Sequence, residues 1–335
     1  MTMLLPGPVG LVAGGSIYDR RIAEGMRALG HDVSLVAQAG SDAVARAAWA
    51  GMAADAMPVI DGDALPGFVA MDAEIAARRT VGLVHHPVSM EPGLSAEARA
   101  ELLAIERRLL PLLASVIVTS PLTAATLSSE YGVAAERISV VVPGTEAAPR
   151  SPGSGGPGCE ILSIGTLLPR KGHDVLLRAL ARLFDLDWHL TIAGEARDAV
   201  CAATLRALAE ELGVAQRVTF EGVAVGNALA ALWARTDVFA LATRYEGYGM
   251  AIAEALARGI PVAVTNGGAA GALVTPDCGT VCDVDDVVQF SKCLRHLIFD
   301  TALRRDLAEG ALKVGAALPD WAAQSAAFAV AVGGT

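Results

Sequence analysis

The sequence predicts an α/β protein built from two domains, each a parallel sheet with helices on both faces. Short runs rich in Val, Ile and Leu alternate with alanine-rich amphipathic stretches, a pattern typical of strands that crossover helices bury on both sides. A segment rich in Pro, Gly and Ser interrupts the alternation near the middle of the chain. The length of 335 residues leaves room for two domains of ordinary size.

The predicted strands fall into two groups of five, one on each side of the interruption. The first group covers 9–13, 32–37, 80–85, 115–120 and 138–144. The segment EAAPRSPGSGGPGCE (146–160) forms neither helix nor strand and is predicted as a linker. The second group covers 160–165, 188–194, 217–222, 237–243 and 260–265. Ligand sites of such sheets lie at the carboxyl ends of the strands, so two facing domains would share a cleft.

Charge and hydropathy argue against several classes of protein. The formal net charge of −10 argues against nonspecific binding to nucleic acid, which depends on Lys and Arg. No uncharged apolar run is long enough for a membrane span, and the start MTMLLPGPVGLVAGGS does not resemble a secretion signal. We therefore expect a cytoplasmic protein. The segment ERRLLPLLA (106–114) allows peripheral contact with the inner membrane face, or a helix packed on its own domain.

Five cysteines are an odd, sparse set for a disulfide framework. The stretch CGTVC (278–282) has no second Cys/His pair at zinc-site spacing, so buried structural thiols are expected there.

Residues 243–264, TRYEGYGMAIAEALARGIPVAV, hold two glutamates, Glu246 and Glu254, separated by seven uncharged residues. The pattern predicts a strand, a loop that carries Glu246, and a helix that carries Glu254. Glu254 can take two hydroxyls bidentately, and Glu246 can reach a polyol group beside the helix start. An amphipathic helix with exposed glutamates is the alternative.

The glycines of this loop predict an anion site. Gly247 and Gly249 permit close approach of the backbone to a ligand. The amides of Gly249, Met250 and Ala251 open the helix without intrahelical acceptors, and a helix start of this kind binds anions. The implied ligand has hydroxyl groups at both ends and phosphate in the middle, which describes a sugar nucleotide.

A second group of polar residues lies in SIGTLLPRKGHDVLLRAL (163–180), with Gly165 and Thr166 at a strand tip and Arg170 and Lys171 before a helix. An Arg fork and a compact Lys charge can neutralise a leaving diphosphate without a metal. Solvated surface charges are the alternative for these two side chains.

These segments together resemble the retaining glycosyltransferases of family 4, which have the GT-B fold. EGYGMAIAEALARGIPVAVTNGG matches the E-x7-E element of that family, and GTLLPRKGHDVLLRAL matches its Arg–Lys diphosphate element. VVPGTE resembles the strand that leads into the interdomain linker. PDWAAQSAAFAVAV resembles the C-terminal crossover helix, with its tryptophan at Trp321.

The resemblance implies two Rossmann-like domains that face each other across a cleft. The N-terminal, acceptor-side domain is expected at 1–146, the linker at 147–158 and the nucleotide-sugar domain at 159–316. A helix at 317–335 is expected to return to the N-terminal domain and to bury Trp321 where it crosses.

The resemblance also implies roles for the residues of the C-terminal half. Glu246 would contact the donor sugar and Glu254 the ribose hydroxyls. Arg170 and Lys171 would bind the diphosphate, and the amides of Gly249–Ala251 the distal phosphate.

In the N-terminal half, VAGGSIYDRRIAEGMRALGHDVSLV resembles the glycine loop and first helix of the family. Gly14, Gly15 and Ser16 would then line the cleft under the phosphates. LVHHP (83–87) matches the strand end whose histidine lies by the reacting carbon of the donor sugar. The alignment leaves His85 and His86 as alternatives for that position, and a purely structural role is also open.

The expected activity is transfer of a hexose from a nucleoside diphosphate sugar to a hydroxyl acceptor, with retention of anomeric configuration. The donor is a co-substrate, so no cofactor is expected. No metal is expected either, because the nearest Asp-x-Asp element, DGDAL (61–65), is far in sequence from the phosphate elements. The expected hydroxyl acceptor is a glycan, a glycolipid or a small molecule. A sugar-nucleotide epimerase and a non-catalytic nucleotide-sugar-binding protein are the alternatives.

Overall fold

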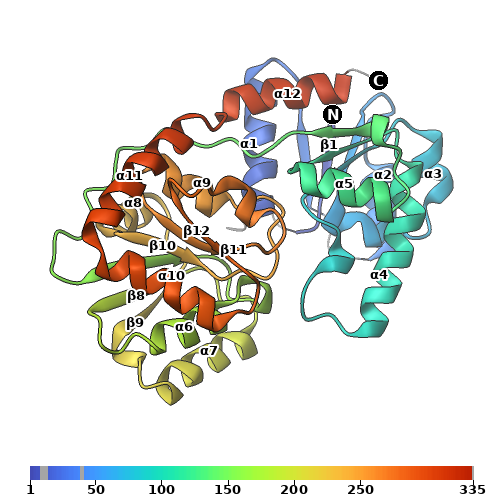
Figure 1. Ribbon diagram of the computed structural model, residues 1–335. Coiled ribbons are helices and arrows are strands. Elements are labelled where there is room, and N and C mark those ends of the chain that lie inside the picture. Colours follow the sequence, from blue (N-terminus) through green and yellow to red (C-terminus); the bar gives the residue numbers. More distant parts are fainter. Residues whose placement is uncertain (8–13, 38–40, 334–335) are drawn as a thin grey trace. The chain divides into compact units, whose positions relative to one another are not determined.

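The computed structural model describes residues 1–7, 14–37 and 41–333 (Figure 1). The chain forms two compact units. The first comprises Met1–Gly144 together with Pro319–Thr335, and the second comprises Thr145–Leu318. The strand expected at 9–13 lies outside the described residues.

The first unit contains a parallel sheet of six strands within the described residues, in the order β2-β1-β3-β4-β5-β6. The strands are β1 (Thr2–Leu5), β2 (Ser34–Ala37), β3 (Pro58–Asp61), β4 (Val81–Val84), β5 (Ser115–Val118) and β6 (Ile138–Val140). The α-helices are α1 (Gly14–Ala28), α2 (Asp42–Ala50), α3 (Asp72–Ala77), α4 (Ala96–Leu109), α5 (Pro121–Glu130) and α12 (Trp321–Gly333). Short 3-10 helices are η1 (Gly62–Phe68), η2 (Val88–Met90), η3 (Leu110–Leu112) and η4 (Ala135–Arg137).

The last helix, α12, packs on the first helix of the same unit, α1, and Figure 1 shows the two side by side in red and blue. Phe328 and Val332 of α12 enter the cluster that Tyr18 and Ile22 of α1 form with the sheet. Phe328 is fully buried, whereas Trp321 is half-buried. The helix is therefore held mainly by Phe328, near its middle, and less by Trp321, which the sequence analysis had placed at the crossing.

The second unit repeats the architecture, with six parallel strands in the order β12-β11-β10-β7-β8-β9 within the described residues. The strands are β7 (Cys159–Ile164), β8 (Trp188–Ala193), β9 (Val218–Gly222), β10 (Val238–Leu241), β11 (Val262–Thr265) and β12 (Gly279–Cys282). The α-helices are α6 (His173–Ala181), α7 (Ala199–Glu211), α8 (Gly226–Arg235), α9 (Met250–Ala257), α10 (Val287–Phe299) and α11 (Thr301–Ala316). The 3-10 helices are η5 (Pro169–Lys171), η6 (Ala215–Arg217) and η7 (Ala270–Leu273).

The central strand β10 is buried on both faces, which explains why its sequence is apolar throughout. Val238 and Ala240 point into one core, and Phe239 and Leu241 point into the core on the other face. Successive side chains of a strand alternate between faces, so a strand covered on both sides has no position left for a polar residue. The α/β fold class predicted from the sequence is confirmed.

Nine of the predicted strands match strands of the structure, but β1, β3 and β12 were missed. β1 is a four-residue strand ended by Pro6 and Gly7. The strand was instead predicted at 9–13, in the longer apolar run that follows. β3 begins with Pro58 and ends with Asp61, residues that are rare inside strands, so DGD reads as a turn. β12 begins with Gly279 and is also only four residues long.

The segment predicted as a linker, 147–158, is bonded to the second unit. The Ser151 hydroxyl donates to the carbonyl of Trp233, at 2.9 Å. Ser154 donates its amide to Asp237 Oδ1 at 3.0 Å, and the other oxygen of that carboxylate accepts the amide of Glu160, at 2.9 Å. The chain here is thus an ordered strap held by polar contacts.

The apolar segment 106–114 packs against its own unit. Glu106 is buried and accepts the amides of Val88 (2.6 Å) and Ser89 (3.1 Å). Leu109 and Leu110 are also buried. Within the described residues, no helix is both long and apolar enough to cross a bilayer.

Candidate active site

The cationic pair follows the carboxyl end of β7. Gly165 and Thr166 come directly after this strand, and Arg170 and Lys171 lie in the short helix η5. Gly172 precedes α6 with φ of 61°, and a Cβ at this position would lie 1.8 Å from the carbonyl oxygen of Ala242. Only glycine can therefore join η5 to α6 so close to the end of β10.

Glu246 lies at the centre of the polar cluster that forms at this edge of the sheet. Its carboxylate is buried, with 8% of the residue exposed. Lys171 Nζ lies 2.5 Å from Glu246 Oε1, and Arg170 Nη1 lies 3.7 Å from the same oxygen. The Thr243 hydroxyl donates to that oxygen at 3.2 Å. Burial raises the pKa of Glu246, but Lys171 and Arg170 outweigh it and hold this pKa below its ordinary value.

The second glutamate lies on α9, which starts at the same edge. Gly249 precedes the helix with φ of 106°, and its carbonyl accepts the first helical hydrogen bonds, from Ile252 and Ala253. The amides of Gly249, Met250 and Ala251 therefore come before any intrahelical donor. Glu254 is half-buried one turn further on.

The structure thus brings together the sequence-predicted residues of the second unit, on the two segments 165–171 and 246–254. Glu246 is tied to the loop after β11 as well, because its amide donates to Gly267 and its carbonyl accepts from Ala269. Gly247 lies between these contacts and the start of α9 and is half-buried.

The sequence analysis missed Arg244, which links the segment 165–171 to the segment 246–254. Its guanidinium makes a bidentate ion pair with Asp174 of α6, at 2.9 and 2.8 Å. Its Nε donates to Asp285 at 2.8 Å, and its backbone amide donates to the carbonyl of Arg170 at 2.7 Å. The partners Asp285 and Asp174 lie 41 and 70 residues away along the chain, so no local pattern could have revealed them.

His173, the first residue of α6, was also missed. It is buried, and its Nε2 lies 3.4 Å from the carbonyl oxygen of Gly165. Its Nδ1 is buried without a hydrogen-bond partner among the described residues. The tautomer that donates from Nε2 fits these contacts, so His173 supports the loop that carries Gly165 and Thr166.

The predicted residues of the N-terminal half lie in the first unit. Gly14, Gly15 and Ser16 form the first turn of α1, and a Cβ on Gly15 would lie 3.0 Å from the His85 ring. His85 and His86 follow β4. Gly15 and His85 are therefore neighbours.

The two histidines differ in their partners. His85 Nε2 lies 3.1 Å from Asp19 Oδ1 and 3.3 Å from Asp61 Oδ2. His86 Nε2 lies 2.9 Å from Glu91 Oε2. His85 is thus held by two buried carboxylates, and His86 by one that is partly exposed.

The sequence matches the family described as glycosyl transferases group 1 over residues 145–314, which is just over half of the chain. The chain belongs to this family. The matched region coincides with the second unit, so it contains Arg170, Lys171, Glu246 and Glu254.

Two curated relatives of this group 1 chain are transferases by name. A D-inositol 3-phosphate glycosyltransferase from Acidothermus cellulolyticus is 30% identical over 66% of this chain and 52% of its own length. A GDP-mannose-dependent alpha-(1-6)-phosphatidylinositol monomannoside mannosyltransferase from Mycolicibacterium smegmatis is 35% identical over 48% of this chain and 44% of its own. The chain thus spans about half the length of the curated relatives it matches.

Solved structures share the fold along the whole chain. The sucrose-phosphate synthase of Thermosynechococcus elongatus has a TM-score of 0.83 at 19% identity, covering 98% of this chain and 96% of its own. HepE of Anabaena, solved with UDP and glucose, has a TM-score of 0.82 at 18% identity, covering 100% and 99%. At these identities the likeness concerns the fold, which is that of GT-B glycosyltransferases.

The group 1 chain was expected to use no metal. Among the described residues, one group of three possible ligands, Asp19, Asp61 and His85, has its ligand atoms within 4.8 Å of one another. Hydrogen bonds between His85 and the two carboxylates account for this approach, so the cluster does not by itself indicate a metal centre.

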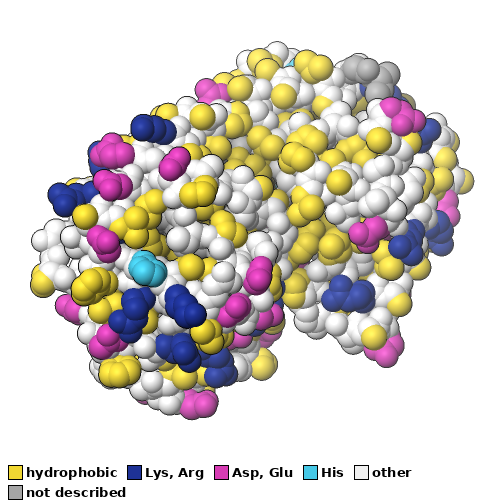
Figure 2. Space-filling view, in the orientation of Figure 1, with side chains coloured by type: hydrophobic (Ala, Val, Ile, Leu, Met, Phe, Trp, Pro, Cys, Tyr) yellow, Lys and Arg dark blue, Asp and Glu magenta, His cyan; other side chains and the backbone are white. Residues whose placement is uncertain are grey.

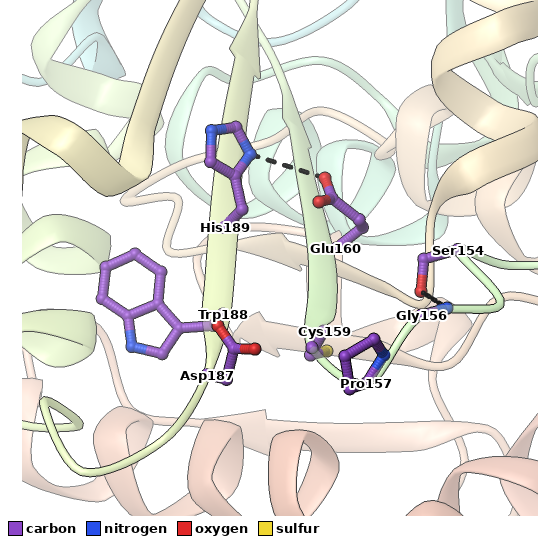
Figure 3. Close-up of a pocket in the computed structure, with 9 residues that line it drawn as sticks. Ser154, Gly156, Pro157, Cys159, Glu160, Asp187, Trp188 and His189 are labelled. Carbon is purple, nitrogen blue, oxygen red and sulfur yellow. Dashed lines mark hydrogen bonds and ion pairs between the residues drawn. The ribbon is translucent and has the colours of Figure 1, made fainter.

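A pocket of about 310 Å³ opens at the opposite edge of the second sheet, at the amino ends of β7 and β8 (Figure 3). His189 Nδ1 and Glu160 Oε2 are 3.4 Å apart at its wall. The lining is completed by Ser154, Gly156, Pro157, Gly158, Cys159, Asp187 and Trp188. The predicted site residues lie at the carboxyl ends of the strands, so this pocket is not part of the candidate site.

Other basic side chains of the second unit gather over α6 and α10, as Figure 2 shows in dark blue. Arg178 is exposed at the end of α6, and Lys292 is exposed on α10. Arg178 comes seven residues after Lys171 and lies in the last turn of α6. These cations therefore belong to the outer surface of the helices and not to the cluster around Glu246.

Proposed function

We propose that this chain is a retaining glycosyltransferase that moves a hexose from a nucleoside diphosphate sugar to a hydroxyl acceptor without a metal ion. The observation that carries the proposal is the cluster of Lys171, Arg170 and Glu246 beside the start of α9. It combines two cations with a helix start whose first amides have no intrahelical acceptor, and both favour a diphosphate.

The roles follow from the charges. Lys171 Nζ has three N–H groups, so it can keep its bond to Glu246 while it donates to a phosphate oxygen. The Glu246 carboxylate is ionised and fixed, so it can accept a hydroxyl group of the sugar through Oε2. Glu254 would accept the ribose hydroxyls, and the amides of Gly249–Ala251 would hold the distal phosphate.

The proposed reaction exchanges one bond at the anomeric carbon for another. The bond from this carbon to the β-phosphate oxygen breaks, and a bond to the acceptor oxygen forms on the same face. The acceptor proton passes to the departing phosphate oxygen. Arg170, Lys171 and the helix start stabilise the charge that develops on the diphosphate, which is the usual way such sites lower a barrier.

The names of the relatives support a sugar nucleotide as donor. The mannosyltransferase relative is GDP-mannose-dependent by name, and HepE was solved with UDP and glucose. The nucleobase and the sugar named for these two proteins differ, so a panel of donors is needed.

Two other functions would use the same cluster. An epimerase would convert the donor without an acceptor, and a non-catalytic binding protein would bind nucleotide without turnover. A transferase instead releases nucleoside diphosphate at a rate that depends on the acceptor. The fold alone does not separate these functions.

The test incubates the protein with UDP- and GDP-hexoses and a cell extract, with EDTA present, and identifies products by mass spectrometry and their anomeric configuration by NMR. Lys171→Ala should lower turnover about a hundredfold, because one aligned charge at a developing anion is worth ~3 kcal/mol. Lys292→Ala is the control, since this exposed lysine lies outside the cluster. Near-normal turnover in both Lys171→Ala and Arg170→Ala, or activity that requires added Mn²⁺, would overturn the proposal.

A further inference from the structure

Three ionisable side chains from three elements of the first unit meet at one nitrogen atom. Asp19 comes from α1, Asp61 is the last residue of β3, and His85 follows β4. Asp19 and Asp61 are each 2% exposed. Both place a carboxylate oxygen within 3.3 Å of His85 Nε2.

The other contacts of this cluster are made to a backbone amide and to an aromatic ring. The second oxygen of Asp61 accepts the amide of Asp63 at 2.7 Å. The Tyr18 ring meets the His85 ring edge to face, at 5.2 Å between centroids, and its hydroxyl donates to the carbonyl of Val141. Tyr18 thus contributes no cation, and His85 is the group that faces both buried carboxylates.

The charge on His85 follows from this arrangement. Two carboxylates buried side by side repel each other, and the pair is stabilised when a cation lies between them. Burial lowers the pKa of His85, but Asp19 and Asp61 outweigh it and raise this pKa well above its ordinary value. Burial, with Asp19, raises the pKa of Asp61 to about 6.

Further charged groups lie nearby. Asp63 follows β3 at the start of η1 and adds an exposed carboxylate two residues after Asp61. Glu91 adds another, which pairs with His86. Carboxylates thus outnumber histidines at this edge of the sheet, which favours the protonated form of the imidazole.

We infer that Asp61 is a positioning residue which, together with Asp19, holds His85 as an imidazolium at neutral pH. The inference rests on the proposed function for its catalytic meaning. A protonated His85 carries a proton on Nδ1, for which no acceptor is recorded among the described residues. It therefore offers a hydrogen-bond donor at Nδ1 and cannot be the base that deprotonates an acceptor hydroxyl. The same contacts distinguish His85 from His86, whose carboxylate partner is Glu91.

Asp61→Asn tests the charge with little change in shape. The amide oxygen of Asn can still accept the Asp63 amide, so η1 keeps its cap, while a neutral NH2 group replaces the charged oxygen that faces His85. Asp19→Asn removes the other charge from a different element. Glu91→Gln is the control, because it changes the partner of His86 and leaves the His85 pair intact.

The first readout is the ¹⁵N NMR titration of the imidazole rings, with His85 assigned by its loss in His85→Gln. In the wild type the His85 signal should stay that of an imidazolium from pH 6 to pH 8. In Asp61→Asn it should titrate within or below this range, and in Glu91→Gln it should remain as in the wild type. A neutral His85 in the wild type at pH 7, or equal shifts in Asp61→Asn and Glu91→Gln, would overturn the inference.

The second readout is the pH profile of kcat. Because only the protonated ring donates from both nitrogens, kcat of Asp61→Asn should fall as pH rises above the new pKa, by up to tenfold per pH unit. The wild type should show no such fall below pH 8. A uniform loss of kcat without a changed profile would mean that Asp61 is merely structural, against the inference. If the NMR result is as expected but no donor is turned over, the proposed function fails while the assignment of charge to His85 stands.

Discussion

Glu246 shows how single residues set the chemistry of this site. A buried carboxylate is stable as an anion only when cations and hydrogen bonds compensate for the lost water. Lys171, Arg170 and Thr243 supply that compensation. Removing one partner of such a cluster leaves a buried charge without compensation, which costs more than the pair itself contributes. The two cations are therefore fixed in place before a donor binds.

His173 gives a prediction at the same scale. Burial lowers the pKa of this histidine to about 4, against about 6.5 in an unfolded chain. The unfolded state then binds more protons between these values, so stability present above pH 6.5 is lost as pH falls toward 4. Between pH 7.5 and pH 5.5 this one group should lower the free energy of unfolding by about 1.3 kcal/mol.

The measurement compares urea unfolding of the wild type and His173→Gln at the two pH values. Gln can donate to the Gly165 carbonyl in place of Nε2, and it has no titration in this range. The pH-dependent loss should therefore be about 1.3 kcal/mol smaller in the variant. His31→Gln, at an exposed position, controls for the loss of one imidazole. Equal losses in wild type and His173→Gln would contradict the prediction.

At the scale of elements, the turn from η5 to α6 sets the position of the cationic pair. Gly172 combines a left-handed backbone with close contact to the end of β10. Gly213, after α7, has a similar φ of 69° but open space around its Cβ position. A comparison of substitutions at these two glycines therefore separates the cost of backbone strain from the cost of a steric clash.

Gly213→Ala should lower the free energy of unfolding by ~1 kcal/mol, the ordinary cost of a left-handed residue with a side chain. Gly172→Ala should cost clearly more, because its methyl group would displace the carbonyl of Ala242, and it should weaken the binding of nucleoside diphosphate. Urea unfolding and calorimetric titration with UDP or GDP measure both effects. Equal losses in the two variants, with nucleotide binding unchanged, would show that the turn does not position Arg170 and Lys171.

The elements also show what the sequence could and could not predict. Glu246, Glu254, Arg170 and Lys171 lie within short motifs, so spacing along the chain was enough to select them. The Arg244–Asp174 pair and the contact of Asp61 with His85 join segments 70 and 24 residues apart, and only the folded sheet brings them together. Asp61 was read as part of a turn because a strand that ends in a buried carboxylate breaks the apolar pattern.

At the scale of the whole molecule, the first unit is built from two separate pieces of the chain. The chain leaves this unit at Gly144, forms the second unit, and returns at Pro319 to add α12. Trp321 meets the Tyr18 ring, at 5.9 Å between centroids, but it is only half-buried. Phe328 fills the core, so α12 should stabilise the first unit mainly through this residue.

Phe328→Ala should lower the stability of the first unit by ~3–5 kcal/mol, the usual cost of removing a buried aromatic ring from a core, and leave the second unit unchanged. The four tryptophans allow each unit to be followed separately, because Trp49 and Trp321 lie in the first, and Trp188 and Trp233 in the second. With 5-fluorotryptophan incorporated, ¹⁹F NMR in urea should show an earlier transition for the first pair alone. Val330→Ala, on the same helix but 72% exposed, is the matched control and should shift neither pair. If all four signals shifted together in Phe328→Ala, the prediction would be contradicted, because the two units would then unfold as one cooperative body.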